Sequence, residues 1–182
     1  MTDNNWRLSE FRRLIENSKR AVIFTGAGIS TESGIPDFRS PGGVWTKYTP
    51  IQYDDYISSE EARRESWQRK FDDSYGFGGA EPNRGHRAIE KLVSDEKVSA
   101  VITQNTDGLH MKSGVPEENI IELHGNSTYA SCLACGLRHE LEPIKEAFLA
   151  DGTIMDCEAC GGSFTVGPQS GNRGSHALAR LR

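Results

Sequence analysis

The sequence has no apolar run of about 18 residues, the length that a membrane-spanning helix requires, so it predicts no contact with a membrane. Its start, Met1–Trp6, lacks the basic end and apolar core of a secretory signal peptide. Lysine and arginine (21) are outnumbered by aspartate and glutamate (26), and a formal charge of -5 argues against a nucleic-acid partner, because nucleic-acid-binding surfaces are basic. These absences predict a cytoplasmic protein.

Cysteine is scarce, and its four residues form two C-x2-C pairs with 21 residues between them. This spacing is typical of a tetrahedral zinc site with four thiolate ligands, and Gly136 and Gly161 would let each turn close on the metal. Four thiolates leave no position for water, so the zinc would be structural. Two disulfides are the alternative, which a reducing compartment disfavours. The expected ligands are Cys132, Cys135, Cys157 and Cys160.

Apolar periodicity predicts helices that alternate with short buried strands. We expect helices over residues 7–18, 58–73 and 86–94, and strands over residues 21–25, 98–103 and 119–123. The first helix is amphipathic and should lie on a core. Apolar strands separated by helices are typical of a parallel sheet, so the sequence predicts an α/β fold of Rossmann-like type.

A glycine-containing loop follows the first predicted strand. In Thr25-Gly26-Ala27-Gly28-Ile29-Ser30, Gly26 permits a tight turn and Gly28 allows a pyrophosphate to approach the backbone. Thr31 stands where a dinucleotide-binding fingerprint has its third glycine, so a turn without a ligand is an equally open interpretation. The following Asp37-Phe38-Arg39 offers charge and an aromatic face to a charged, partly aromatic ligand.

Two more polar loops follow the second and third strands. Gln104-Asn105-Thr106-Asp107 offers amides and a carboxylate that could bind a ribose or a carboxamide, or could simply cap the next helix. Glu122-Leu123-His124-Gly125-Asn126 places a histidine at the end of a strand, where it suits a general base, although a lone histidine is more often structural. Ligands of parallel α/β sheets bind at the carboxyl ends of the strands.

The three loops together resemble the motifs of the sirtuins, over about residue 19 to Gly162. The resemblance implies an NAD-dependent protein lysine deacetylase, with an incomplete Rossmann-like sheet and a small inserted zinc-binding module. His124 and Asn105 would be catalytic, and acylated-lysine proteins or peptides would be substrates. The cofactor-binding residues that it implies are Gly26, Ala27, Gly28, Ser30, Asp37, Phe38, Arg39, Gln104, Asn105 and Asp107.

The family mechanism, applied to these positions, implies two steps. The acyl-lysine oxygen attacks the ribose carbon that carries nicotinamide, and nicotinamide leaves. His124 then takes a proton from a ribose hydroxyl, so that the acyl group passes to ADP-ribose. A Tyr-x-x-Arg pair, found in some sirtuins that remove acidic acyl groups, is not recognised here, which favours acetyl-lysine.

The composition changes after the second cysteine pair, since no acidic residue follows Glu158. We expect a Rossmann-like part over residues 1–126 that includes the helical segment, a zinc module over residues 127–162 and a disordered tail over residues 163–182. A changed reading frame or a shortened gene would produce this break. The alternative function is therefore an inactive sirtuin remnant, at most a zinc-stapled binding module, with an unpaired sheet edge and exposed apolar faces.

Overall fold

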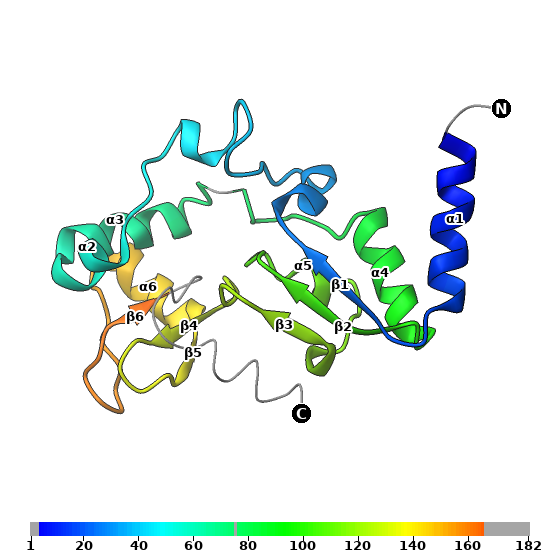
Figure 1. Cartoon of the computed structure of the whole chain (residues 1–182). Helices are drawn as coiled ribbons and strands as arrows, with labels where there is room; N and C mark the ends of the chain where they lie inside the picture. The colour runs from blue at the N-terminus through cyan, green and yellow to red at the C-terminus, as the bar shows by residue number, and fades with distance from the viewer. Residues whose placement is uncertain (1–3, 75, 166–182) are drawn as a thin grey trace.

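The computed structural model describes residues 4–74 and 76–165 and contains two lobes that lie side by side (Figure 1). The elements, in chain order, are α1 (Asn4–Asn17), β1 (Ala21–Thr25), η1 (Ala27–Ser33), η2 (Val44–Thr46), α2 (Tyr53–Ser58), α3 (Glu60–Phe71), α4 (Arg84–Ser94), β2 (Val98–Thr103), α5 (Leu109–Lys112), η3 (Glu117–Asn119), β3 (Ile120–Glu122), β4 (Tyr129–Cys132), β5 (Arg138–Glu140), α6 (Leu141–Asp151) and β6 (Phe164–Thr165). The predicted helices and strands are present; β1 and β2 have the predicted ends, and the ends of the others are shifted.

The first lobe is built on a parallel sheet of order β1-β2-β3. Phe24 pairs with Ile102, and Ile102 pairs with Ile121, so the three strands run in register and end at the same edge. Helix α4 covers one face, where Ile89 and Val93 pack with Val101 of the central strand. The predicted α/β class is confirmed, and the loops after the strands meet at one edge of this sheet.

Helix α1 does not pack its apolar face on a core, contrary to the prediction from the sequence. Four large apolar side chains of α1 are more than half exposed to solvent among the described residues, and Figure 1 shows the helix standing apart from the sheet. Val22 and Phe24 of β1 are also more than half exposed, on the sheet face opposite α4. The exposed apolar faces expected from the sequence are therefore present. The four α1 residues are Trp6, Leu8, Phe11 and Leu14.

The second lobe combines a small antiparallel sheet of order β5-β4-β6 with helices from two parts of the chain. Trp67 of α3 shares a core with Ile144 and Phe148 of α6 and with Cys132 and Cys157. The sequence places α2 and α3 with the first lobe, whereas in the structure α3 packs on the cysteine module. No helix in the described part of the chain has the length and apolar character needed to span a membrane.

The small sheet continues past the expected end of the module at residue 162. Phe164 pairs with Cys132, and Thr165 pairs with Ser131, although the sequence places both β6 residues in the tail. Phe164 is buried, its ring lies 4.4 Å from that of His139, and its carbonyl accepts a 2.5 Å hydrogen bond from the Tyr56 hydroxyl. Burial raises the pKa of Tyr56 to about 12, so this hydroxyl keeps its proton. The rest of the expected tail, residues 166–182, lies outside the described residues.

Candidate functional site

The first and second motif loops are joined by a hydrogen-bond network at the carboxyl edge of the sheet. The Ser30 hydroxyl donates to Oδ2 of Asp107 at 2.7 Å. The Asn105 side chain donates to the Gly26 carbonyl and to the Ser30 hydroxyl, both at 3.1 Å. Because Ser30 and Asn105 are buried, these bonds fix the two loops in one geometry. The structure thus brings Gly26, Ser30, Asn105 and Asp107 together.

Four hydrogen bonds join the third loop and the adjacent Ser127 to the second loop and to the end of β2. The Thr106 carbonyl accepts from the Ser127 amide at 2.8 Å and from its hydroxyl at 2.6 Å, and the Thr103 carbonyl accepts from the Leu123 amide at 2.9 Å. In addition, Nδ1 of His124 lies 2.9 Å from the Gln104 carbonyl oxygen. His124, an exposed residue, therefore stands at the edge where the other two motifs meet.

The contact of His124 decides which of its ring nitrogens is free. A carbonyl oxygen can only accept, so Nδ1 must carry the proton that forms this hydrogen bond. In the neutral ring Nε2 then holds a lone pair and can accept a proton from a ligand. The exposed side chain of Gln104 lies on the residue whose backbone orients His124.

The glycine loop leaves its backbone accessible. It continues as η1, which ends at Gly34, whose φ of 87° is in the left-handed region that favours glycine. A Cβ added to Gly26 or Gly28 would meet no atom within 4 Å, so space remains beside this backbone for a ligand. Ala27 opens η1 between these two glycines. The loop therefore fits the close approach of a dinucleotide that the sequence predicts.

The contacts of Asp37, Phe38 and Arg39 lie within their own loop. The Asp37 carboxylate accepts from the amides of Arg39 and Ser40 and from the Ser40 hydroxyl, and the bonds from Ser40 are the main reason that its pKa is lowered. The Phe38 ring lies 5.0 Å from that of Trp45, and the Arg39 side chain is exposed. Asp37 therefore holds the turn, while Arg39 is accessible to an anionic ligand.

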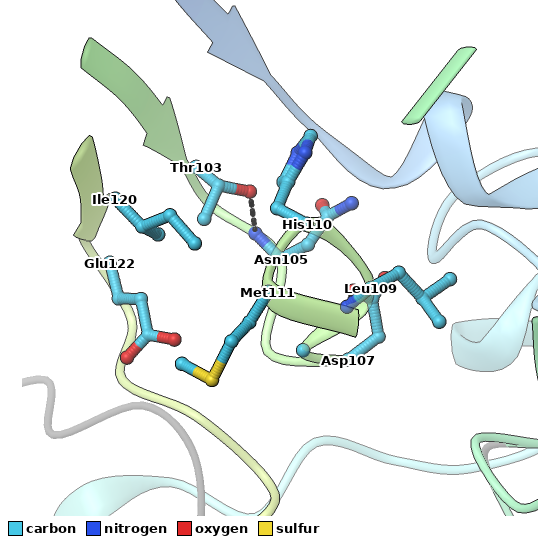
Figure 2. Close-up of a pocket in the computed structure, with 9 residues that line it drawn as sticks. Thr103, Asn105, Asp107, Leu109, His110, Met111, Ile120 and Glu122 are labelled. Atoms are coloured by element: carbon cyan, nitrogen blue, oxygen red, sulfur yellow. Dashed lines mark hydrogen bonds between the residues drawn. The ribbon is translucent and has the colours of Figure 1, made fainter. Parts of the chain in front are cut away.

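A pocket lies between β2, β3 and α5, beneath the second loop (Figure 2). In its wall, His110 donates from Nε2 to the Thr25 hydroxyl at 2.9 Å, and Thr25 donates to the Thr103 hydroxyl at 2.9 Å. Nδ1 of His110 is buried without a hydrogen-bond partner. Burial, aided by nearby His86, lowers the pKa of His110 to about 4, so this ring is neutral and structural. Asn105, Asp107 and Glu122 also line the pocket.

The four cysteines come together as the sequence predicts. Their sulfur atoms lie within 4.8 Å of one another, with Cys132 and Cys160 at 3.5 Å and Cys135 and Cys157 at 3.7 Å. A zinc ion at 2.3 Å from four sulfurs gives sulfur–sulfur distances of about 3.8 Å. Disulfide sulfurs would lie at about 2.05 Å, so the disulfide alternative does not fit. These residues would hold a structural zinc ion.

Several residues outside the predicted site hold the third loop. Glu122 ends β3 with its carboxylate directed at the following turn, and its hydrogen-bonding partner Asn126 is only 2% exposed. Tyr129 of β4 donates to the same carboxylate at 3.4 Å. The position of Glu122 at the end of a strand could have marked it as a site residue. The identity of its partners depends on how the chain folds back after Gly125.

Comparisons with known proteins match both the loops and the fold. The Sir2 family model matches residues 26–169, which extends beyond Gly162. The chain is 51% identical over 147 residues to an NAD-dependent protein deacetylase of Rhodopseudomonas palustris and 53% identical over 147 residues to NAD-dependent protein deacetylase 1 of Bradyrhizobium diazoefficiens. These matches cover 81% of this chain and 58% of each relative, so the chain spans less than two thirds of their length.

A solved structure described as Sir2 with a p53 peptide and NAD+ is similar in fold, with a TM-score of 0.77 and 30% identity. That match covers 94% of this chain and 68% of the other. The family model spans more than half of the chain and includes all three loops and the four cysteines. The chain belongs to the Sir2 family, the sirtuins.

Proposed function

We propose that this chain carries the nicotinamide-ribose part of an NAD-dependent protein lysine deacetylase that acts on acetyl-lysine proteins or peptides. The proposal rests above all on His124, whose Nδ1 is engaged by the Gln104 carbonyl so that Nε2 is free to accept a proton. The names of the two bacterial relatives and the peptide and NAD+ in the solved Sir2 complex support the same reaction class.

The residues around His124 suit a ligand with a carboxamide and a ribose. Asp107 presents a carboxylate, and Asn105 an amide, at the same edge as the accessible backbone of Gly26 and Gly28. NAD, when bound, supplies an electrophilic ribose carbon and nicotinamide as leaving group. His124 would take a proton from a ribose hydroxyl, and Arg39 would hold the phosphates. The zinc ion would hold the second lobe together and take no part in the chemistry.

Nicotinamide release tests the proposal directly. The purified chain is incubated with NAD and an acetyl-lysine peptide, and free nicotinamide and deacetylated peptide are quantified together. Equal amounts of both products, dependent on the peptide, are expected. Binding of NAD without turnover would instead support the alternative, a non-catalytic zinc-stapled module.

A further inference from the structure

We propose that Glu122 is a positioning residue, which acts through Asn126 to hold the turn that presents His124. The inference rests on the proposed function of His124 as a general base, and it adds a residue that orients this base. Glu122 lies at the end of β3, two residues before His124, and Asn126 lies two residues after it. The two side chains therefore bracket the histidine.

The bond between these residues closes the turn. Nδ2 of Asn126 donates to Oε1 of Glu122 at 2.5 Å, while Oδ1 of Asn126 accepts from the Thr128 amide at 2.8 Å. Gly125 reverses the chain between them with a φ of 72°. Since Asn126 is buried, loss of its acceptor would leave a buried amide without a partner, and the turn would have to rearrange.

His124 depends on this turn because its own contacts are few. The ring is exposed, and its hydrogen bond to the Gln104 carbonyl requires the turn to lie close to the second loop. If the turn moves, that bond breaks, and a free imidazole in water populates both neutral tautomers. The fraction of rings with a lone pair at Nε2, the atom that faces the reaction in our proposal, then falls.

Glu122 also connects the turn to the second lobe. Its other carboxylate oxygen accepts from the Tyr129 hydroxyl, and the Tyr129 ring lies 4.2 Å from the Arg138 guanidinium. Arg138 in turn forms a 3.3 Å ion pair with Glu117 of η3. Figure 2 shows the Glu122 side chain at the side of the pocket that also holds Met111. A merely structural role would make Glu122 one contact between lobes, with no effect on the His124 ring.

The test reverses the direction of the hydrogen bond. Asn126→Asp keeps the oxygen that caps Thr128 but places a carboxylate against Glu122. Glu122→Gln in the same chain restores the pair, because the new amide can donate to the new carboxylate. Long-range proton–nitrogen NMR of the histidine rings reports the tautomer of His124, whose signals are assigned by their loss in His124→Gln. Circular dichroism and zinc content report folding.

We expect the wild-type His124 ring to show the proton on Nδ1. In Asn126→Asp the ring should change to a mixture of tautomers, and kcat for deacetylation should fall about tenfold with the peptide KM within about twofold, as for a lost positioning contact. The double variant should recover both. Glu117→Gln removes the charged partner of Arg138 and leaves the turn unchanged. Its His124 tautomer and its kcat should match those of the wild type.

The outcomes separate this inference from the proposed function. If the wild-type chain has no deacetylase activity, the proposed function is wrong. The tautomer of His124 in the variants, measured by NMR, still tests the role of Glu122. Glu122→Ala removes the same acceptor without adding a second carboxyl group, and it is judged by the same signals. An unchanged tautomer in folded Glu122→Ala, or a tautomer change in Asn126→Asp that the double variant does not reverse, would overturn the inference.

Discussion

The hydroxyl of Ser30 donates a 2.7 Å hydrogen bond to the carboxylate of Asp107, which lies 77 residues later in the chain. This bond joins the loop after β1 to the loop after β2, and the Ser127–Thr106 bonds join the third loop to the second. Three short segments that are far apart in sequence therefore form one surface. Their side chains should act together, so loss of one contact should affect ligand binding at its neighbours.

Ser30→Ala should weaken the binding of NAD by this chain. The change removes the donor to Asp107 and the acceptor of the Asn105 side chain. Loss of these bonds lets the two loops move apart, so we expect the dissociation constant of NAD to rise about tenfold, which corresponds to about 1.4 kcal/mol. Isothermal titration calorimetry measures it. Thr31→Ala is the matched control, because that exposed hydroxyl bonds the Gly28 carbonyl; equal weakening in both variants would contradict the assignment.

His124→Ala should separate the two steps of the proposed reaction. Loss of a general base lowers the rate of the step that it catalyses by about 10²–10⁴-fold. If His124 acts after nicotinamide leaves, exchange of labelled nicotinamide into NAD should continue in the variant while deacetylated peptide disappears. Parallel exchange and product assays measure this, and the loss of both activities to the same degree would place His124 in the first step instead.

Metal removal should expose Trp67. Cys132 and Cys157 belong to the same core as Trp67, which is 2% exposed and stacks on Phe71 at 5.4 Å. Without zinc the two cysteine pairs lose the ion that joins them, and this core should loosen. We expect a strong chelator to shift Trp67 emission to longer wavelength, and added zinc to reverse the shift. Trp67→Phe reports the emission of Trp6 and Trp45 alone and serves as the control. Emission that stays unchanged after zinc is removed would contradict a structural metal.

Acid should destabilise the chain through His110. Its folded-state pKa of about 4 lies below the ordinary value of 6.5, so the unfolded state binds the proton more readily. The stability from the neutral ring is complete above pH 6.5 and is lost as the pH falls towards 4. At about 1.4 kcal/mol per pKa unit, the loss is up to about 3 kcal/mol.

Urea unfolding at several pH values tests this prediction. His110→Gln keeps a donor for Thr25 but cannot titrate, so its free energy of unfolding should depend less on pH between 6.5 and 4. Thr31→Ala, an exposed change that leaves every titrating group in place, should retain the slope of the wild type. Parallel slopes for His110→Gln and the wild type would show that another group causes the acid sensitivity.

Phe164→Ala should destabilise the second lobe although Phe164 lies beyond the second cysteine pair. The side chain is 2% exposed and belongs to the core that contains Trp67. Truncation of a buried phenylalanine costs about 3–5 kcal/mol. Leu149→Ala on the same lobe removes a side chain that is 59% exposed and should change stability by less than about 0.5 kcal/mol. Thermal unfolding followed by Trp67 fluorescence measures both, and similar effects in the two variants would contradict the burial of Phe164.

The sequence by itself determined the chemistry of the loops and the metal ligands. The spacing of Cys132, Cys135, Cys157 and Cys160 predicts the sulfur cluster, because two-residue gaps let each pair close on one ion. The strand periodicity predicts β1, β2 and β3, and a common strand direction brings their polar ends to one edge. These are local patterns, readable without knowledge of distant contacts.

Only the tertiary structure decided which surfaces meet. The sequence does not show that Trp67 shares a buried core with Cys132 and Phe164, which come from segments much later in the chain. Apolar spacing predicts the apolar face of α1, which the described structure leaves exposed. Burial is non-directional, so a sequence states which side chains leave water and not their partners. The contact between Glu122 and Asn126 depends on the chain reversal at Gly125, a conformation that a residue type permits but does not impose.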